Sequence, residues 1–493
     1  MAHVLGIDLG SSSVKVSLLD TATGRTLDQE QRPAAAEMAI EAPRPHWAEQ
    51  DPHRWWANTT EAIHALKARH SLAEVSAIGV AYQMHGLVLL DAEGEVVRPS
   101  IIWCDSRAVA LGREAAESIG QHRIETTTLN GPGNFTASKW AWVARHEPEV
   151  LARATTVMLP GDYIAFKLTG ERNTTASGLS EMILWDFGQR RPASFVLEHY
   201  GLDVDLLPPL VPTFGDQGTV LTEVAQEFGF RQNARVAYRA GDQPNNAYAL
   251  NVLEPGETAA TAGTSGVVYA VTDQRVYDRQ QRVNAFLHVN AAAEAERLGV
   301  LLCVNGTGSA YAWLRRTLGA TALPDYAQVN AWAAESEIGG DGLRFYPWGN
   351  GAERMLGNAD LGARLEGLTF ARHGAPELCA AVQDGIAAAL TYGTRGLDDV
   401  GARPQVVRAG RANLFLSDRF AQAFAQLGEA PLQLYDTDGA QGAARGAAVG
   451  AREYADHAEA LASLRVVAEF EPRAELAAAY EDYYERWLAG TQR

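Results

Sequence analysis

One turn of this chain combines an acid, a glycine and three hydroxyl groups in a spacing that suits phosphate binding. Residues 8–13 read Asp-Leu-Gly-Ser-Ser-Ser and separate two short apolar runs. Consecutive backbone N–H groups in such a turn form a concave anion site, and Asp8 could hold a magnesium ion directly or through water. Taken alone, the motif favours an ordinary hairpin, because Gly-Ser turns are common. The candidate phosphate contacts are Gly10, Ser11, Ser12 and Ser13.

A second turn of the same kind lies roughly 250 residues further along the chain. It follows the stretch Thr-Ala-Ala-Thr-Ala and precedes Val-Val-Tyr-Ala, which predicts a strand, a turn and a strand. Two such units indicate a duplicated domain, and together the two turns could hold two different phosphates of one nucleotide. The residues of the second turn are Gly263, Thr264, Ser265 and Gly266.

A candidate general base follows an apolar stretch in the first half of the chain. Asp242 stands between Gly241 and Gln243, where a carboxylate could face a substrate hydroxyl while the glutamine orients the substrate. Phosphoryl transfer requires mainly positioning, charge neutralisation and such a proton acceptor. The structural alternative is an Asx-type turn that closes the N-terminal domain.

The tetrapeptide Gln-Met-His-Gly at residues 83–86 lies between two predicted strands. Gln83 and His85 could donate hydrogen bonds to sugar hydroxyls, and Met84 could pack against a carbon skeleton. A single histidine between strands is more often a structural residue, so the spacing alone does not decide between the two.

Composition limits the classes of partner. The formal net charge is −18, from 42 Lys and Arg against 60 Asp and Glu, which argues against nucleic acid and anionic membranes as partners. No segment is apolar over a membrane-spanning length, and the N-terminus lacks the basic region of a signal peptide. None of the four lysines follows a glycine, which excludes a P-loop. The three cysteines have no pairing or metal-ligand spacing, as expected of buried thiols in a reducing cytoplasm.

Length and pattern predict two domains, 1–250 and 251–493, with turn chemistry at residues 254–256. A β-meander is expected at the N-terminus, followed by a helix and two more strands, and the chain becomes alanine-rich and helical beyond residue 370. The predicted helices of the first half are 55–69, 139–145 and 162–168, its inner strands are 75–80 and 87–90, and the late helices are 378–397, 418–427 and 441–454.

With these motifs assembled, the chain resembles the FGGY family of carbohydrate kinases from end to end. Residues 6–15, Lys15 included, are similar to the first phosphate loop of the family, and residues 263–266 to the second. The tetrapeptide at 83–86 looks like the signature of the family branch that acts on xylulose, in contrast to the Gln-Arg-Glu type of glycerol kinases. Further segments that fit the family are 47–56, 99–107, 159–163, 241–242 and 349–354.

The resemblance implies an α/β protein with two ribonuclease-H-like domains, of the actin and hexokinase type, that face a central cleft. The N-terminal domain would bind the sugar and the C-terminal domain the nucleotide. The implied reaction is ATP-dependent phosphorylation of a ketopentose, with D-xylulose as the first expectation, in the cytoplasm and with Mg²⁺. Asp242 would accept the proton of the 5-hydroxyl, Asp8 would help hold Mg-ATP, and a homodimer is common in the family. The residues implied to line the sugar pocket are Gln83, Met84, His85, Asp242 and Gln243.

One segment departs from the family pattern. Many members have a Gly-Gly-Gly-Ala run where the adenosine end of ATP lies, but residues 409–413 here read Ala-Gly-Arg-Ala-Asn. Gly410 and Asn413 are retained as candidate nucleotide contacts. Arg411 could stack on adenine, reach the α-phosphate or cap the following helix, so the nucleotide contacts stay open.

Three other functions remain alternatives to a xylulose kinase. A change of one or two pocket side chains could redirect the enzyme to ribulose, L-xylulose or arabinitol. A non-catalytic sugar sensor would lack Asp242 or an intact phosphate loop, and both are present. An actin-like or Hsp70-like ATPase would need a surface for a protein partner, and would leave the motif at residues 83–85 without a role.

Overall fold

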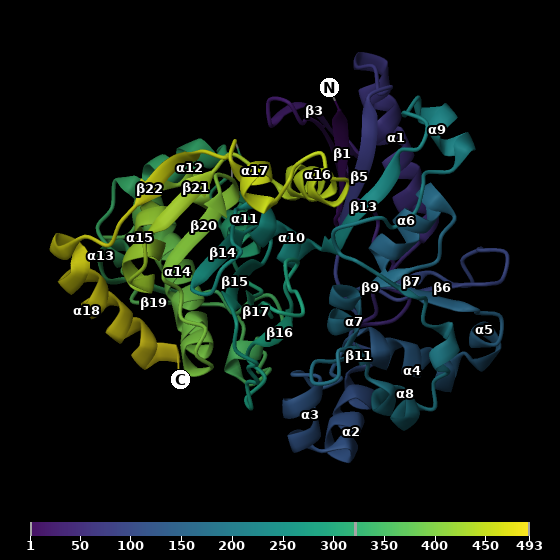
Figure 1. Cartoon of the computed structure of the whole chain (residues 1–493). Helices are drawn as coiled ribbons and strands as arrows, with labels where there is room; N and C mark the ends of the chain where they lie inside the picture. The colour runs from purple at the N-terminus through teal and green to yellow at the C-terminus, as the bar shows by residue number, and fades with distance from the viewer. Residues whose placement is uncertain (1, 320–322, 492–493) are drawn as a thin grey trace. The chain divides into compact units, whose positions relative to one another are not determined.

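The computed structural model describes residues 2–319 and 323–491, and the chain forms two compact units (Figure 1). Unit 1 consists of Met1–Asn251, Phe286–Glu296 and Thr437–Leu464. Unit 2 consists of Val252–Ala285, Arg297–Asp436 and Arg465–Arg493. The compact units therefore differ from a single division near residue 250, because two later segments return to unit 1.

A five-stranded sheet forms the centre of unit 1. Its strands are β1 (His3–Leu9), β2 (Val14–Asp20), β3 (Arg25–Arg32), β5 (Val75–Tyr82) and β13 (Arg235–Gly241), in the order β13-β5-β1-β2-β3. β1 pairs antiparallel with β2 and parallel with β5, and β13 pairs parallel with β5. The parallel strands are nearly continuous apolar runs and are buried along most of their length. The predicted N-terminal meander and the strand at 75–80 are confirmed.

Helices pack against this sheet, and their starts are readable in the sequence. The side chain of Asp51 accepts a hydrogen bond from the N–H of His53, and Pro52 occupies the first helical position of α1. Trp55 and Ile63 then point into the core. The helices of unit 1 are α1 (Pro52–Arg69), α2 (Val109–Ile119), α3 (Gln121–Thr127), α4 (Thr136–His146), α5 (Pro148–Leu151), α6 (Pro160–Thr169), α7 (Ala176–Met182), α8 (Ser194–Tyr200), α9 (Thr222–Phe228), α10 (Asp242–Ala249), α16 (Gly439–Gly450) and α17 (His457–Leu461).

Short strands and one 3₁₀ turn connect these elements in unit 1. They are β4 (Glu49–Gln50), β6 (Val88–Leu90), β7 (Ser100–Ile101), β8 (Thr156–Met158), β9 (Thr174–Thr175), β10 (Trp185–Asp186), β11 (Arg191–Pro192), β12 (Leu210–Val211) and η1 (Val204–Leu206). β4 pairs with β7, and β6 with β8.

The late helix α16 packs on the sheet of unit 1, although the sequence places it in the second half of the chain (Figure 1). Two glycines permit this close approach. A Cβ at Gly6 would lie 1.9 Å from the carbonyl oxygen of Ala440, and a Cβ at Gly79 would lie 2.0 Å from that of Ala443. The backbone of α16 therefore touches the backbone of β1 and β5, which only glycine allows.

Unit 2 is built around a seven-stranded sheet in the order β16-β17-β15-β14-β20-β21-β22. The strands are β14 (Glu257–Ala262), β15 (Gly266–Thr272), β16 (Asn284–Leu287), β17 (Leu298–Val304), β20 (Val406–Gly410), β21 (Leu432–Tyr435) and β22 (Val466–Phe470). The further elements are α11 (Gly308–Leu318), α12 (Tyr326–Ala334), α13 (Gly339–Gly342), α14 (Ala375–Asp399), α15 (Asp418–Gly428), α18 (Ala474–Thr491), β18 (Arg344–Tyr346), β19 (Arg364–Glu366), η2 (Arg354–Leu356) and η3 (Asn413–Leu416).

The two sheets share one strand order. β14 pairs antiparallel with β15 and parallel with β20, while β17 pairs antiparallel with β15 and β21 parallel with β20. The run β21-β20-β14-β15-β17 therefore repeats the run β13-β5-β1-β2-β3 of unit 1, strand for strand. The internal repeat that the two short turns suggest extends through five strands of each sheet.

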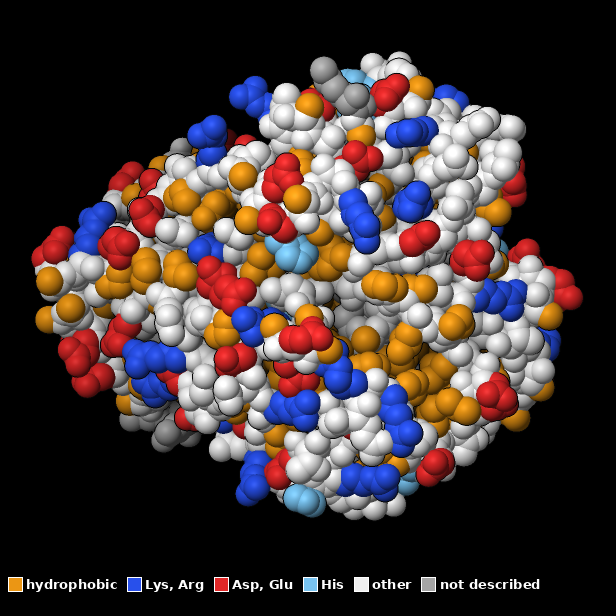
Figure 2. Space-filling model, in the orientation of Figure 1, with side chains coloured by type: hydrophobic (Ala, Val, Ile, Leu, Met, Phe, Trp, Pro, Cys, Tyr) orange, Lys and Arg blue, Asp and Glu red, His pale blue; other side chains and the backbone are white. Residues whose placement is uncertain are grey.

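On the face shown in Figure 2, basic side chains lie interspersed with acidic ones, as is usual for a globular surface. None of the helices in the described ranges combines the length and the apolarity that crossing a membrane requires.

Candidate functional site

Two carboxylates stand at the same edge of the unit 1 sheet. Asp8 lies near the end of β1, and Asp242 begins α10 directly after β13. Because β1, β5 and β13 run parallel, their carboxyl ends meet at one edge. Burial and the charge of Asp438 raise the pKa of Asp8 to about 6, against the opposing effect of Lys15. Burial and the charge of Asp8 raise the pKa of Asp242 to about 7, which hydrogen bonds with Gln243 partly offset.

The first turn, residues 10–13, is held through its carbonyl groups. The N–H of Gly10 donates to the oxygen of Ser13 at 2.9 Å and closes the turn. The oxygen of Ser11 accepts from Gln50 Nε2 at 2.7 Å, and the oxygen of Ser12 accepts from the N–H of Met38 at 2.7 Å. With the carbonyls fixed on one side, the N–H groups of the turn can face an anion on the other.

Lys15 of the first loop forms an ion pair that the sequence did not predict. Its Nζ lies 3.0 Å from Asp438 Oδ2. Asp438 also caps α16 by accepting from the N–H of Gln441, and Gln29 Nε2 donates to both of its oxygens. Asp438 is 423 residues away from Lys15, so no local pattern could have linked them.

Two residues of the tetrapeptide after β5 are packed inside unit 1. Gln83 is buried and donates to Gln50 Oε1 at 2.9 Å, so this amide group is engaged within the protein. Met84 packs against the start of α10, because a Cβ at Gly241 would lie 2.6 Å from its Cγ. The motif at residues 83–85 and the motif at residues 241–243 are thus brought together.

His85 is held in a strained backbone conformation. Its φ is 64°, in the left-handed region, which costs a residue with a Cβ roughly 1–2 kcal/mol. Its N–H donates to Glu181 Oε2 at 3.2 Å, and its Nδ1 lies 3.0 Å from the Glu181 carbonyl oxygen. The ring packs edge-on against Phe135, with 4.7 Å between ring centroids. A non-glycine residue keeps this conformation only where its surroundings enforce it.

Glu181, on α7, is a site residue that the sequence reading missed. Its carboxyl is buried and accepts from the hydroxyl of Tyr82 at 2.6 Å as well as from His85. Burial raises its pKa well above the ordinary value, and the charge of Asp242 adds to the effect. No motif surrounds it; a single acid inside the mostly apolar stretch 178–185 was the available signal.

The second turn, residues 263–265, is held by the start of α11 in unit 2. The oxygen of Gly263 accepts from the N–H of Gly308 at 2.8 Å and from Thr307 Oγ1 at 3.0 Å, and the oxygen of Thr264 accepts from the N–H of Ser309 at 3.1 Å. As in the first turn, the carbonyls are fixed and the amides are left to face an anion.

A buried carboxylate supports the segment just before α11. Glu353, in the segment 349–354 that resembles the family, accepts from the N–H of Asn305 at 3.0 Å. Burial raises its pKa to about 7, although the amides of Asn305 and Gly306 act in the opposite direction. The structure gives this residue a role in holding the turn, which the sequence did not assign.

The segment that departs from the family pattern lies beside the second turn. Asn413 has a φ of 54°, and its Nδ2 would lie 3.7 Å from a Cβ at Gly263. The N–H of Arg411 donates to the oxygen of Tyr435 at 2.8 Å, and its guanidinium lies 3.5 Å from Asp418 Oδ1 at the start of α15. The guanidinium of Arg411 thus contacts the start of α15, which is compatible with the capping role considered for it.

Comparison with known proteins identifies the family of this chain. Residues 3–248 match the model of the N-terminal domain of the FGGY family of carbohydrate kinases. A xylulose kinase of Escherichia coli (strain K12) is 32% identical over 446 residues, which cover 90% of this chain and 88% of the relative. The chain belongs to the FGGY family of carbohydrate kinases. It is therefore an enzyme of the carbohydrate kinase class, as the resemblance implied.

Solved structures of this family confirm the fold class. A xyloylose kinase from Brucella ovis superimposes with a TM-score of 0.85 at 29% identity, covering 99% of this chain and 98% of the other. A xylulose kinase from Rhodospirillum rubrum gives a TM-score of 0.86 at 26% identity, with the same coverage. The expected α/β class with two ribonuclease-H-like domains is confirmed for this FGGY kinase.

Proposed function

We propose that the protein transfers the γ-phosphoryl group of ATP to the 5-hydroxyl of D-xylulose. The observation that carries the proposal is the meeting of Asp242, Asp8 and the Met84–His85 pair at one edge of the unit 1 sheet. Family membership supplies the reaction class, and the relatives named above as xylulose kinases support the choice of sugar.

In this proposal Asp242 is the proton acceptor. The oxygen of the 5-hydroxyl forms a bond to the γ-phosphorus, the bond from that phosphorus to the bridging oxygen of ADP breaks, and the hydroxyl proton passes to Asp242. A base whose pKa lies near neutrality suits this step at neutral pH, and the pKa of Asp242 is about 7. Gln243, bonded to Asp242, would orient both the carboxylate and the sugar.

The residues around Asp8 fit a magnesium ion. The charge of Asp438 raises the pKa of Asp8, and the charge of Asp8 raises the pKa of Asp242, a repulsion that a nearby cation would relieve. No group of three or more His, Cys, Asp or Glu converges on a metal position within residues 2–319 and 323–491. This agrees with magnesium, which commonly takes one or two carboxylates and completes its shell with water and phosphate. Bound there through Asp8, the ion would neutralise charge on the phosphates.

The two turns would hold the phosphates through their N–H groups and hydroxyls. In unit 1 the contacts would come from Ser11, Ser12, Ser13 and Lys15, while Gly10, whose N–H closes the turn, would let the phosphate approach the backbone. In unit 2 they would come from Gly263, Thr264, Ser265 and Gly266. Gly410 and Asn413, the latter beside the second turn, would contact the rest of the nucleotide, whereas Arg411, paired with Asp418, would act through the start of α15.

The sugar pocket would be lined mainly by Met84, His85 and Gln243. Met84 presents an apolar side chain next to Gly241, and His85 presents a partly exposed ring. Gln83 donates to Gln50, so its contribution would be to fix the loop rather than to contact the sugar. Because the reaction consumes ATP, a cytoplasmic location belongs to the proposal. A homodimer also belongs to it and is tested by light scattering coupled to gel filtration.

The test is a coupled assay of ADP formation with Mg-ATP and a panel of pentuloses and pentitols. We expect D-xylulose to give the highest kcat/KM, and Asp242→Asn to lower kcat by about 10²–10⁴-fold. Asp216→Asn removes an exposed carboxylate of the same unit and is the matched control, with activity near that of the wild type.

Other outcomes separate the alternatives. Preference for ribulose, L-xylulose or arabinitol would support the kinase activity but contradict D-xylulose as the substrate. ADP formation that does not depend on any sugar would favour the ATPase reading. Sugar binding without turnover would favour the sensor.

A further inference from the structure

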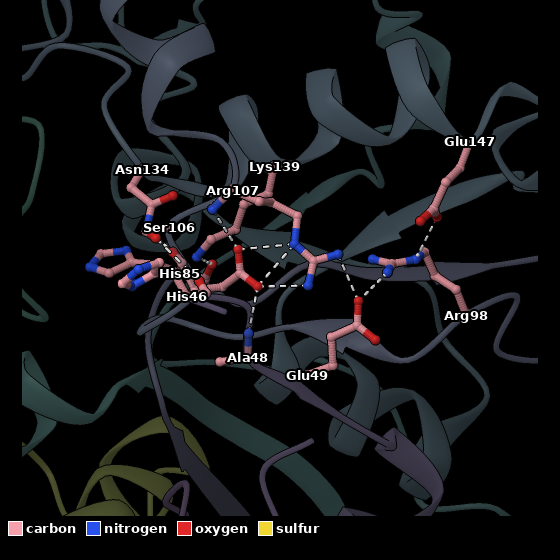
Figure 3. A network of polar contacts seen from close by, with 11 residues as sticks. His46, Ala48, Glu49, His85, Arg98, Ser106, Arg107, Asn134, Lys139 and Glu147 are labelled. Atoms are coloured by element: carbon pink, nitrogen blue, oxygen red, sulfur yellow. Dashed lines mark hydrogen bonds and ion pairs between the residues drawn. The ribbon is translucent and has the colours of Figure 1, made fainter. Parts of the chain in front are cut away.

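A ladder of alternating charges, most of them buried, runs through unit 1 from Glu147 to Asp105, and Figure 3 draws it together with Lys139 and His85. It joins parts of two sequence segments, 47–49 and 105–107, that resemble the family but had no assigned role. Arg98 lies 2.9 Å from Glu147 and 2.6 Å from Glu49. Glu49 lies 2.7 Å from Arg107, which lies 2.6 Å from Asp105.

Asp105 is the anchor of the ladder. It is fully buried and accepts from the N–H of Ala48 at 2.6 Å and from the guanidinium of Arg107. The indole ring of Trp47 packs on the other side of this guanidinium, 3.7 Å from its centre. Since every charge in the ladder has a partner of opposite sign, the ladder can hold fixed positions without water.

Lys139, on α4, lies within the electrostatic influence of Asp105, the last member of the ladder. It is fully buried, and its Nζ donates to the carbonyl oxygen of His85 at 2.7 Å. The charges of Asp105 and Glu181 favour the protonated amine, whereas burial opposes it and lowers its pKa to about 7. A buried ammonium destabilises a core unless it makes compensating contacts. The hydrogen bond described for Lys139 goes to the loop that carries the proposed sugar contacts.

The peptide groups on either side of His85 are therefore hydrogen-bonded to side chains of two helices. Glu181 on α7 accepts from the N–H of His85, and Lys139 on α4 donates to its oxygen. These two contacts hold the left-handed backbone conformation and set the direction of the imidazole ring, which packs against Phe135 and Phe286.

We propose that Lys139 is a positioning residue for sugar recognition, which acts by fixing the backbone of His85. The inference rests on the proposed function and adds to it a residue that does not touch the substrate. If Lys139 merely filled space, an apolar side chain of similar length would replace it without changing sugar affinity. If it positions His85, that replacement weakens sugar binding and leaves ATP binding intact.

The test compares Lys139→Met with Lys67→Met, which removes an exposed lysine from α1. Both variants are assayed for the KM of D-xylulose, the KM of ATP and kcat, and their thermal unfolding is recorded. We expect Lys139→Met to raise the sugar KM at least tenfold with the KM of ATP within twofold of the wild type. Lys67→Met should leave all three constants unchanged.

Two results would overturn the inference. The first is a folded Lys139→Met enzyme with an unchanged sugar KM. The second is a crystal structure of that variant in which His85 keeps its positive φ and its ring direction. Should Lys139→Met not fold, Lys139→Gln keeps a polar group and is expected to raise the sugar KM in the same way by a smaller factor.

Failure of the proposed function gives a different pattern. If the wild-type enzyme acts on another sugar of the panel, the KM of that sugar is compared between the wild type and the two variants instead. A wild-type protein that phosphorylates none of them contradicts the proposed function, and the crystal structure of Lys139→Met then decides the role of the lysine by itself.

Discussion

The hairpins β1–β2 and β14–β15 occupy equivalent places in two similar sheets but differ in the chemistry around their turns. In each, the first strand pairs antiparallel with the second and parallel with a later strand, β5 or β20. Each turn is also fixed through carbonyl oxygens that accept hydrogen bonds from elsewhere in its own unit. The backbone of the two halves has thus been retained.

The side chains have diverged. Around the first turn lie three charged groups, Asp8, Lys15 and Asp438, within one set of contacts. The second turn is held by a hydroxyl and two amides at the start of α11. We therefore expect the amides of both turns to face anions, and the acids beside the first turn to handle the metal ion and the reacting proton. The predictions below test that division.

The largest difference is expected from removing a functional group of each turn. Asp8→Asn should lower kcat by about 10²–10³-fold, because a charge that acts on the transferring phosphoryl group is lost. Ser265→Ala should lower kcat/KM by a factor of about 2–10, the effect of one hydrogen bond. Steady-state rates over a range of Mg-ATP concentrations measure both. Equal losses of activity in the two variants would contradict the proposed functional difference between the two turns.

A pH effect on stability should come from the carboxylate behind the second turn. The pKa of Glu353 is about 7 in the folded protein and 4.5 ordinarily, so between these values the unfolded chain carries fewer protons than the folded one. The stability that this group contributes is full below about pH 4.5 and is lost as the pH rises to about 7.

The glutamine side chain of Glu353→Gln does not titrate. The stability of this variant relative to the wild type should therefore increase as the pH rises from about 4.5 to about 7. The expected gain is up to about 3 kcal/mol. Urea unfolding at several pH values measures it, and a difference between the two proteins that is constant from pH 4.5 to 7 would contradict the assignment. Asp325→Asn, at an exposed helix cap of unit 2, controls for loss of an acid.

Glycine substitutions should affect the two sheets unequally. Gly6→Ala would bring a Cβ within 1.9 Å of the α16 backbone, and it should destabilise unit 1 by about 1–3 kcal/mol or more. Gly266→Ala meets the side chains of Thr307 and Leu390 at 2.6 and 2.8 Å, which can move, so its cost should be smaller. The denaturant midpoints of the two variants measure these losses of stability. A larger loss for Gly266→Ala than for Gly6→Ala would show that α16 can shift.

The smallest expected effect concerns the hydroxyl that supports the second turn. Thr307→Val removes the hydrogen bond to Gly263 and should raise the KM of ATP by a factor of about 2–10, with the sugar KM unchanged. Thr317→Val on the same helix is the control, because its hydroxyl bonds only within α11. An unchanged KM of ATP would mean that the backbone amides of α11 suffice to hold the turn.

Much of the framework is local and was therefore accessible from the sequence. The hairpins, the helix that Asp51 and Pro52 begin, the two phosphate turns and the Asp242 segment are each specified by residues within about one turn of one another. The roles predicted for the site residues remain predictions. Glu181, Asp438 and the support from Lys139 were not found, because each acts on a partner far away in the sequence.

By itself, the sequence determined the strands, the turns, the acids at the strand ends and the family. The tertiary structure alone decided that α16 packs on the first sheet, since its contact depends on Gly6 and Gly79 lacking a Cβ. It also decided that His85 is fixed from α4 and α7, which lie far from it in sequence. Local propensities act over a few residues, whereas burial and charge pairing act between any surfaces that the fold brings into contact.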